Sequence, residues 1–62
     1  MNAKDTIATW KWRIVKANIS AKAFSESLGI QPQQFSLYIT GKQNPSIERF
    51  DMIEGKLKDL GV

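Results

Sequence analysis

The sequence predicts an all-α protein, folded as one domain into a small bundle of four or five short helices. Apolar residues recur at intervals of three and four along most of the chain, which is the period of a helix with one buried face. Short segments rich in Gly, Asn, Pro and Ser separate these stretches, and no alternating pattern indicates a strand. A chain of 62 residues is also too short for a second domain with its own core.

The first helix is expected to begin at a cap provided by Asn2 or Asp5 and to continue to about Ala17. Its apolar residues lie on one stripe at helical spacing and are Ile7, Trp10, Ile14 and Ala17. Asn18 and Ile19 then interrupt the pattern.

The segment WKW at residues 10–12 gives this first helix a second apolar side. Trp10 and Trp12 are separated by about 200° around a helix, so they cannot both face one core. Trp12 and Val15 therefore form a separate surface, which is covered either by the last helix or by a second molecule. Met52 is a candidate member of that dimer or partner surface.

Two short helices are expected next. Ser20 is a good N-cap for a helix from Ala21 to Leu28, and Gly29 ends this helix because glycine readily adopts a positive φ. The following helix begins near Pro32, since proline is favoured in a first helical turn, and stops at Thr40-Gly41. Its apolar stripe consists of Phe35, Tyr38 and Ile39.

The last helix follows a loop at residues 42–45 and is expected to be capped by Ser46, with Glu48 favourably placed for the helix dipole. Glu54 and Lys58 lie one turn apart and are expected to pair. The apolar stripe of this helix comprises Ile47, Phe50, Ile53, Leu57 and Leu60.

The composition argues against an enzyme. The chain has no Cys and no His, which removes disulfides, thiolate metal sites, the commonest general base and the commonest zinc ligand. It also lacks a glycine-rich phosphate loop and a carboxylate cluster suited to catalysis. We expect no cofactor, no metal and no small-molecule ligand. Without a span of about 20 apolar residues or a signal-peptide pattern, a cytoplasmic protein with no membrane partner is expected.

Charge is unevenly distributed along the chain. Residues 1–44 carry a net charge of +4, whereas residues 45–62 carry −1. A basic body with a nearly neutral tail fits an anionic partner on one side, but a charge of +3 is also ordinary for a soluble protein. Charge alone leaves both interpretations open.

The two middle helices joined by Leu28-Gly29-Ile30 have the arrangement of a helix-turn-helix, although a generic helical hairpin has the same turn. Residues 20–46, SAKAFSESLGIQPQQFSLYITGKQNPS, resemble the helix-turn-helix core of the lambda-repressor-like family, which includes phage repressors and Cro proteins. The matching features are Ser20, Ala23-Phe24, Leu28-Gly29-Ile30, Phe35-Ser36-Leu37-Tyr38, Thr40-Gly41-Lys42 and Asn44-Pro45-Ser46. The motif itself covers about residues 20–41. Ala21 departs from the family, which often has Gln there, and Pro32 and Leu37 replace polar or basic residues.

This resemblance implies a transcriptional regulator of the phage or prophage Cro/repressor type. Such a protein reads a double-stranded DNA operator through the major groove, as a homodimer at least on DNA, and is nucleoid-associated when bound in a bacterial cell. The implied base-reading residues are Gln31, Pro32, Gln33, Ser36 and Leu37. The implied DNA-backbone contacts are Ser20, Lys22, Gln34, Thr40, Lys42, Gln43 and Asn44.

The segment from Ser27 to Gly41 contains no charged residue, which suits base reading. Bases are distinguished by hydrogen-bond pattern, and glutamine can pair bidentately with adenine. Two alternatives remain open from the sequence: the glutamines are merely solvated surface, or the fold serves as a protein-interaction module, such as an antitoxin-like partner or a corepressor adaptor.

Overall fold

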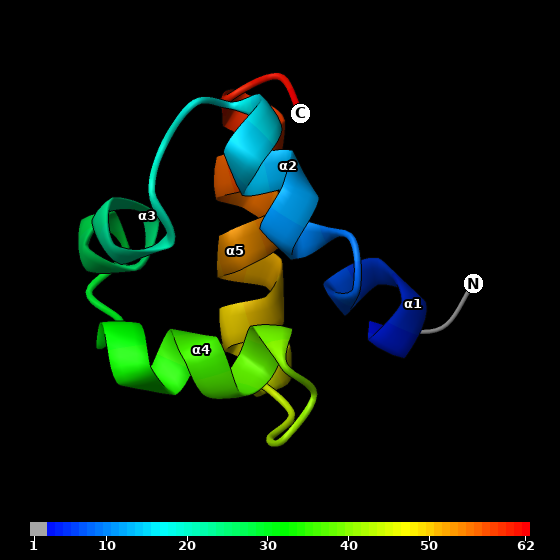
Figure 1. The fold of residues 1–62 in the computed structure, drawn as a ribbon. Helices are drawn as coiled ribbons and strands as arrows, with labels where there is room; N and C mark the ends of the chain where they lie inside the picture. Colours follow the sequence, from blue (N-terminus) through cyan, green and yellow to red (C-terminus); the bar gives the residue numbers. More distant parts are fainter. Residues whose placement is uncertain (1–2) are drawn as a thin grey trace.

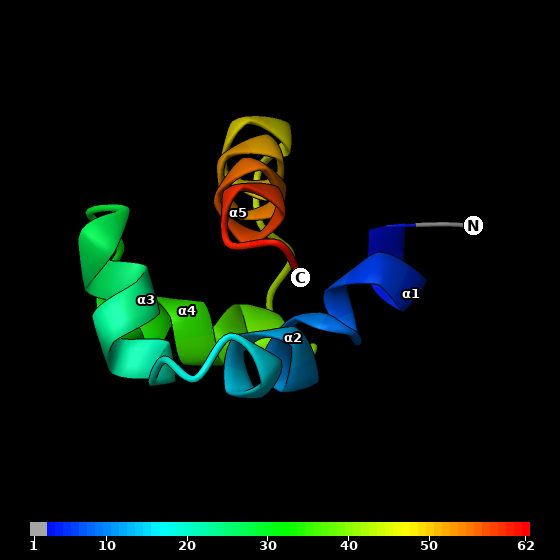
Figure 2. The same ribbon diagram turned by 90° about the horizontal axis from the view of Figure 1, so that it is seen from above.

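The computed structural model describes residues 3–62, and these residues form five helices without any strand. The helices are α1 (Ala3–Ile7), α2 (Trp10–Lys16), α3 (Ala21–Ser27), α4 (Pro32–Ile39) and α5 (Ile47–Asp59), as shown in Figure 1. The longest helix is α5; α4 lies at the end where α5 begins and α2 toward the end where α5 finishes (Figure 1), and both lie on the same side of α5 (Figure 2). The prediction of an all-α bundle is confirmed, in its five-helix form.

An aromatic cluster joins four of the helices. Trp10 of α2 stacks on Phe35 of α4, with ring centroids 6.4 Å apart, and contacts Phe50 of α5 at 5.5 Å. Phe24 of α3 packs on Phe35, also at 5.5 Å. Offset and tilted ring pairs of this kind stabilise a core beyond the apolar area they bury. Among the residues that the structure describes, the buried apolar cluster consists of Ile7, Trp10, Ile14, Phe24, Ile30, Phe35, Tyr38, Ile53 and Leu57.

The expected first helix is in fact two helices, so the prediction of one continuous helix to Ala17 is wrong. The chain turns at Ala8 and Thr9, where both the backbone N–H and the hydroxyl of Thr9 donate to the Thr6 carbonyl, at 3.0 and 2.6 Å. A threonine hydroxyl that bonds the preceding turn competes with the regular helical pattern. Asp5 lies inside α1 rather than at its cap, and Asn2, the other proposed cap, is outside the described residues.

The serine caps are confirmed. The Ser20 hydroxyl accepts a hydrogen bond from the Ala23 N–H at 3.0 Å, and the Ser46 hydroxyl accepts one from the Arg49 N–H at 3.2 Å. Each cap satisfies a helical N–H group that would otherwise lack a partner, and such a bond contributes about 1 kcal/mol. The starts of α3 and α5 are therefore set by local chemistry as well as by packing.

Both helices of the motif end at a glycine in the left-handed region. Gly29 has a φ of 73° and Gly41 a φ of 78°, conformations that L-residues adopt only with strain. After α3, the Ile30 N–H donates to the Ser25 carbonyl at 3.0 Å, which is the six-residue closure of a Schellman motif. This closure turns Ile30 into the core, where it is 2% exposed.

The expected apolar stripe of α5 holds only in its middle. Ile53 and Leu57 are fully buried, but Ile47 is 83% exposed and Leu60 is exposed beyond the end of the helix. Ile47 lies at the first position of α5, about 120° around the helix from Ile53, and no element covers it there.

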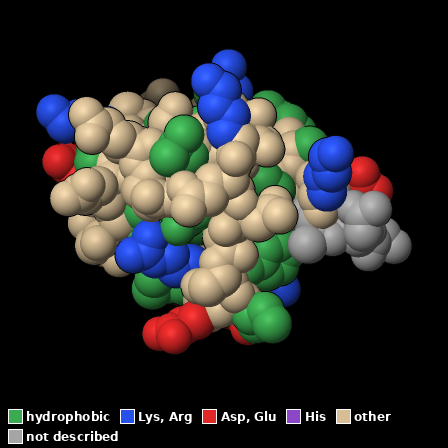
Figure 3. Space-filling model, turned by 90° about the horizontal axis from the view of Figure 1, so that it is seen from below, with side chains coloured by type: hydrophobic (Ala, Val, Ile, Leu, Met, Phe, Trp, Pro, Cys, Tyr) green, Lys and Arg blue, Asp and Glu red, His purple; other side chains and the backbone are tan. Residues whose placement is uncertain are grey.

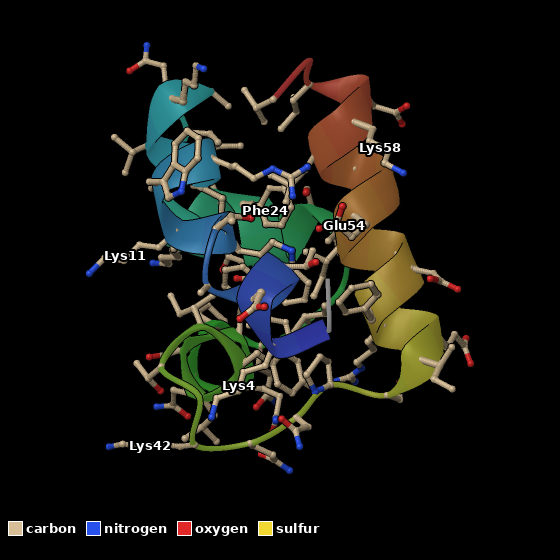
Figure 4. All side chains as sticks on the ribbon, turned by 90° about the vertical axis from the view of Figure 1, so that its right-hand side faces the viewer. Lys4, Lys11, Phe24, Lys42, Glu54 and Lys58 are labelled. Carbon is tan, nitrogen blue, oxygen red and sulfur yellow. The ribbon has the colours of Figure 1, made fainter. Side chains whose placement is uncertain are left out.

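The predicted pairing of Glu54 with Lys58 is also corrected. Among the described residues, the carboxylate of Glu54 forms its ion pair with Arg13 of α2, at 2.8 Å. Figure 4 shows Glu54 directed toward the other helices, with Lys58 one turn further along α5. Glu54 therefore links two helices rather than bracing α5 alone.

Candidate nucleic-acid interface

The helix pair α3–α4 is held together on its inner side. Phe24 and Phe35 are in contact, and Ile30 closes the turn between the two helices. Ser25 of α3 is completely buried, and its hydroxyl donates to the Lys22 carbonyl at 3.0 Å. Because its only polar side-chain group is bonded within its own helix, this small side chain sits in the interior without an unpaired hydroxyl.

The outward side of α4 carries uncharged polar residues. Phe35 and Tyr38 face the core, being 1% and 4% exposed. Gln33, Ser36 and Leu37 are exposed on the other side of the helix. Three of the five residues predicted to read bases are therefore brought together on one surface.

The other two predicted base readers are placed differently. Gln31 is exposed and is the N-cap of α4, although its side chain makes no capping hydrogen bond. Pro32 is half-buried at the first position of α4, about 60° around the helix from Phe35. Pro32 thus lies on the core side of the helix start, whereas Gln31 is available at the edge of the outward surface.

Several of the predicted DNA-backbone contacts already have partners within the chain. The Ser20 hydroxyl is used as a cap, and the Thr40 hydroxyl donates to the Ser36 carbonyl at 2.8 Å. The Gln34 amide donates to the side-chain oxygen of Gln43 at 2.7 Å, which ties the start of α4 to the loop that follows it. These residues shape the surface and retain only part of their hydrogen-bonding capacity for a ligand.

Lys22 and Lys42 are exposed at separate places around α4, at the start of α3 and in the loop after α4. Figure 3 views the molecule from below α4. Uncharged surface occupies most of this face, and both basic and acidic side chains lie around it. Figure 4 shows the Lys42 side chain extending away from the body at this end. The arrangement is a largely uncharged face with Lys22, Lys42 and other charged side chains around it.

Two cations that the sequence did not connect with this surface also lie close to it. Lys4 of α1 lines a hollow together with Thr40, Gly41 and Asn44, at the loop after α4. Arg49 of α5 donates from Nη1 to the Tyr38 hydroxyl at 2.8 Å and lines a second, polar hollow beside the start of α4. Both placements depend on contacts between distant helices, and no local spacing signals them.

The proposed partner surface is only partly assembled. Trp12 is 56% exposed and Val15 is 70% exposed on α2, so α5 does not cover them. Lys16 lies over the Trp12 ring, with Nζ 5.6 Å from its centroid. Met52 is exposed on α5, but it is about 200° around that helix from Glu54, the residue that contacts α2. Met52 therefore points away from α2 and does not extend the Trp12 surface.

The α2–α5 connection that supports this scaffold is electrostatic as well as apolar. The Glu54 carboxylate accepts hydrogen bonds from Trp10 Nε1 at 2.7 Å and from Arg13 Nη1 at 2.8 Å. Burial raises the pKa of Glu54, but the hydrogen bonds from Trp10 and Arg13 and the charges of Arg13 and Lys58 outweigh it. The net result is a pKa below the ordinary value of 4.5. Arg13 also donates from Nη2 to the Val62 carbonyl at 2.9 Å.

Residues 3–62 contain no group of three or more acidic, His or Cys side chains placed to hold a metal ion. No helix in that range is both long and apolar enough to cross a bilayer. Comparison with protein-family models, curated proteins and solved structures finds no match for this chain.

Proposed function

We propose that this chain is a sequence-specific DNA-binding regulator of the lambda-repressor-like helix-turn-helix type, with α4 as the helix that enters the major groove. The observation that carries the proposal is the exposed face of α4. It presents Gln33, Ser36 and Leu37 outward, while Phe35 and Tyr38 fix the helix to the core. A rigidly held helix with a neutral, hydrogen-bonding outer face suits the reading of base edges.

The chemistry of this face favours A·T base pairs. A glutamine amide can donate to adenine N7 and accept from adenine N6, and Leu37 can contact a thymine methyl group. Arginine, the commonest reader of guanine, is absent from residues 27–41. We therefore expect an operator with A·T pairs at the positions that Gln33 and Leu37 reach.

Affinity comes from residues around the face rather than from the face itself. Lys22 at the start of α3 and Lys42 in the loop after α4 are exposed, and each can neutralise a phosphate. Gln43 and Asn44 can add uncharged contacts to the sugar-phosphate chain. Because one small domain makes few phosphate contacts, the protein binds as a homodimer on a two-half-site operator.

A second candidate is a helix-turn-helix fold that binds another protein, and the exposed α2 surface favours it. Trp12 and Val15 leave a large apolar area uncovered, and a tryptophan in such a setting is typical of a protein-contact surface. The two candidates differ in whether the α4 face or the α2 face carries the activity.

Selection of bound sequences from random duplex DNA tests the proposal. We expect enrichment of a sequence with two related half-sites, spaced by about one helical turn or a multiple of it. Binding to the enriched duplex should weaken steeply as salt is raised. Recovery of random sequence, with weak binding to every duplex, would refute the DNA-reading function and favour the protein-interaction module.

A further inference from the structure

A polar hollow lies between the helix-turn-helix turn and the first turn of α5. It is lined by Gly29, Gln31 and Gln34 from the motif and by Arg49 from α5. Arg49 is the only charged residue among these lining residues, and no carboxylate shares the hollow with it. The hollow is thus a polar pocket with one cation.

The guanidinium of Arg49 is anchored but not saturated. Its Nη1 donates to the Tyr38 hydroxyl at 2.8 Å, and Tyr38 is itself 4% exposed and fixed in the core. A guanidinium has five N–H donors. Within residues 3–62 this guanidinium makes no ion pair, and the Tyr38 hydroxyl is its one hydrogen-bond acceptor. The remaining donors are held in a defined orientation, which lowers the entropy that binding an anion would cost.

The position of the hollow relative to α4 indicates which anion fits. Gln33 belongs to the outward face, and Gln34 lies about 100° further around the helix, so the hollow is on the flank of α4. When a helix occupies the major groove, base edges lie in front of it and sugar-phosphate backbones run along its flanks. A planar guanidinium with free donors matches the geometry of phosphate oxygens.

We propose that Arg49 binds a backbone phosphate of the DNA, in the hollow beside Gln31 and Gln34, and that the Tyr38 hydroxyl positions it. This inference rests on the proposed DNA-binding function. It adds a phosphate contact from α5 on the flank of α4, distinct from the lysines of α3 and of the loop. An arginine that served only as a bridge between α4 and α5 would affect folding but not the salt dependence of DNA binding.

The test compares variants on the selected operator across a range of salt concentrations. Arg49→Gln should weaken binding and reduce the slope of log affinity against log salt by about one unit, because one phosphate contact is lost. Arg49→Lys keeps the charge and should keep the slope. Tyr38→Phe should retain the slope but weaken binding several-fold, since the guanidinium loses its anchor. The matched control is Lys58→Gln, an exposed charge near the far end of α5, which should leave the slope unchanged.

Duplexes with single neutral methylphosphonate substitutions locate the contact. Substitution at one position per half-site should weaken DNA binding by the parent protein but should not further weaken DNA binding by Arg49→Gln. Thermal unfolding with and without inorganic phosphate, at constant ionic strength, separates the two sources of phosphate. Stabilisation by free phosphate that Arg49→Gln abolishes would assign the hollow to a small anion instead of DNA.

The outcomes separate this inference from the function on which it rests. A folded parent that binds no DNA would remove the proposed function and this contact together. The contact alone would be overturned if the parent binds its operator, Arg49→Gln has the same salt slope as the parent, and every methylphosphonate position affects the two proteins equally. In that case a lower unfolding temperature of Arg49→Gln would identify Arg49 as a structural bridge.

Discussion

Replacement of Glu54 tests the connection between α2 and α5. Its carboxylate accepts from Trp10 Nε1 and Arg13 Nη1, and the Arg13 and Glu54 side chains are only 14% and 15% exposed. Glu54→Ala leaves the indole N–H of a fully buried tryptophan without its acceptor. A hydrogen bond to a charged group is worth about 1.5–3 kcal/mol, and an unpaired buried donor costs a similar amount. We expect the free energy of unfolding to fall by about 2–4 kcal/mol, which is less than the sum of the two hydrogen-bond contributions because both bonds share one oxygen and partial exposure weakens the ion pair.

The conservative variant separates hydrogen bonding from charge. Glu54→Gln keeps an acceptor for Trp10 and removes the ion pair with Arg13, so it should cost about half as much, roughly 1–2 kcal/mol. Asp51→Asn, an exposed acid on the same helix, is the matched control and should stay within about 0.5 kcal/mol of the parent. Urea unfolding followed by circular dichroism measures all three. A Glu54→Ala protein no less stable than Asp51→Asn would refute the contribution of this contact.

The contribution of Glu54 to stability depends on pH with a defined sign. The pKa of Glu54 is lower in the folded protein than its ordinary value of 4.5, so the folded state favours the ionised carboxylate. This contribution is complete above that ordinary pKa and is lost as the pH falls through the folded-state pKa. Glu54→Gln should therefore be destabilised at neutral pH and approach the parent in acid. A difference in the free energy of unfolding between the parent and Glu54→Gln that stayed constant from pH 7 to pH 2 would contradict the lowered pKa of Glu54.

Two further predictions concern affinity and assembly. Lys22→Ala and Lys42→Ala should each weaken binding to operator and random DNA alike and lower the salt slope by about one unit; parental slopes would remove these lysines from the phosphate contacts. If Trp12 lies in a homodimer contact, Trp12→Glu should be a folded monomer that has lost operator binding, as measured by sedimentation. Unchanged mass together with unchanged binding would place Trp12 outside any required interface.

Local chemistry made much of this fold predictable. Ser20 and Ser46 cap the helices expected of them, and Gly29 adopts the positive φ that its place after α3 requires. Phe24 and Phe35 face the core as their spacing predicts. These features depend on residues within one or two turns of each other, so the sequence contains the necessary information.

The predictions that were wrong concern features that depend on tertiary contacts or on competing local hydrogen bonds. The expected first helix is interrupted at Ala8 and Thr9, where the Thr9 hydroxyl bonds back to Thr6, and apolar periodicity does not detect this interruption. Glu54 pairs with Arg13 across 41 positions instead of with Lys58 one turn away. The charge partner of Glu54 is determined by the packing of α2 against α5, which no local pattern in the sequence indicates.

In the candidate site, too, some features follow from the local sequence and others from the packing of distant helices. The exposure of Gln33, Ser36 and Leu37 follows from the helical period once Phe35 and Tyr38 are assigned to the core. The positions of Lys4 and Arg49 beside this surface follow from packing of α1 and α5 on the motif, which no local pattern encodes.

The central claim, that the outward face of α4 reads bases, is tested most directly by Gln33→Ala on the selected operator. Gln33 is exposed and follows directly on Pro32, where α4 begins. A bidentate pair contributes about 1–3 kcal/mol of discrimination between bases. Gln33→Ala should therefore bind the operator about ten- to a hundredfold more weakly, with random-DNA binding nearly unchanged and preference relaxed at one A·T pair per half-site.

Stability measurements on the same variant complete the test. Gln33→Ala should unfold within about 0.5 kcal/mol of the parent, because the side chain is exposed. Phe35→Ala is the contrasting core variant, 1% exposed in the parent, and should lose about 3–5 kcal/mol. A Gln33→Ala protein that binds the operator as tightly as the parent, with the same base preference, would contradict the claim that α4 reads DNA.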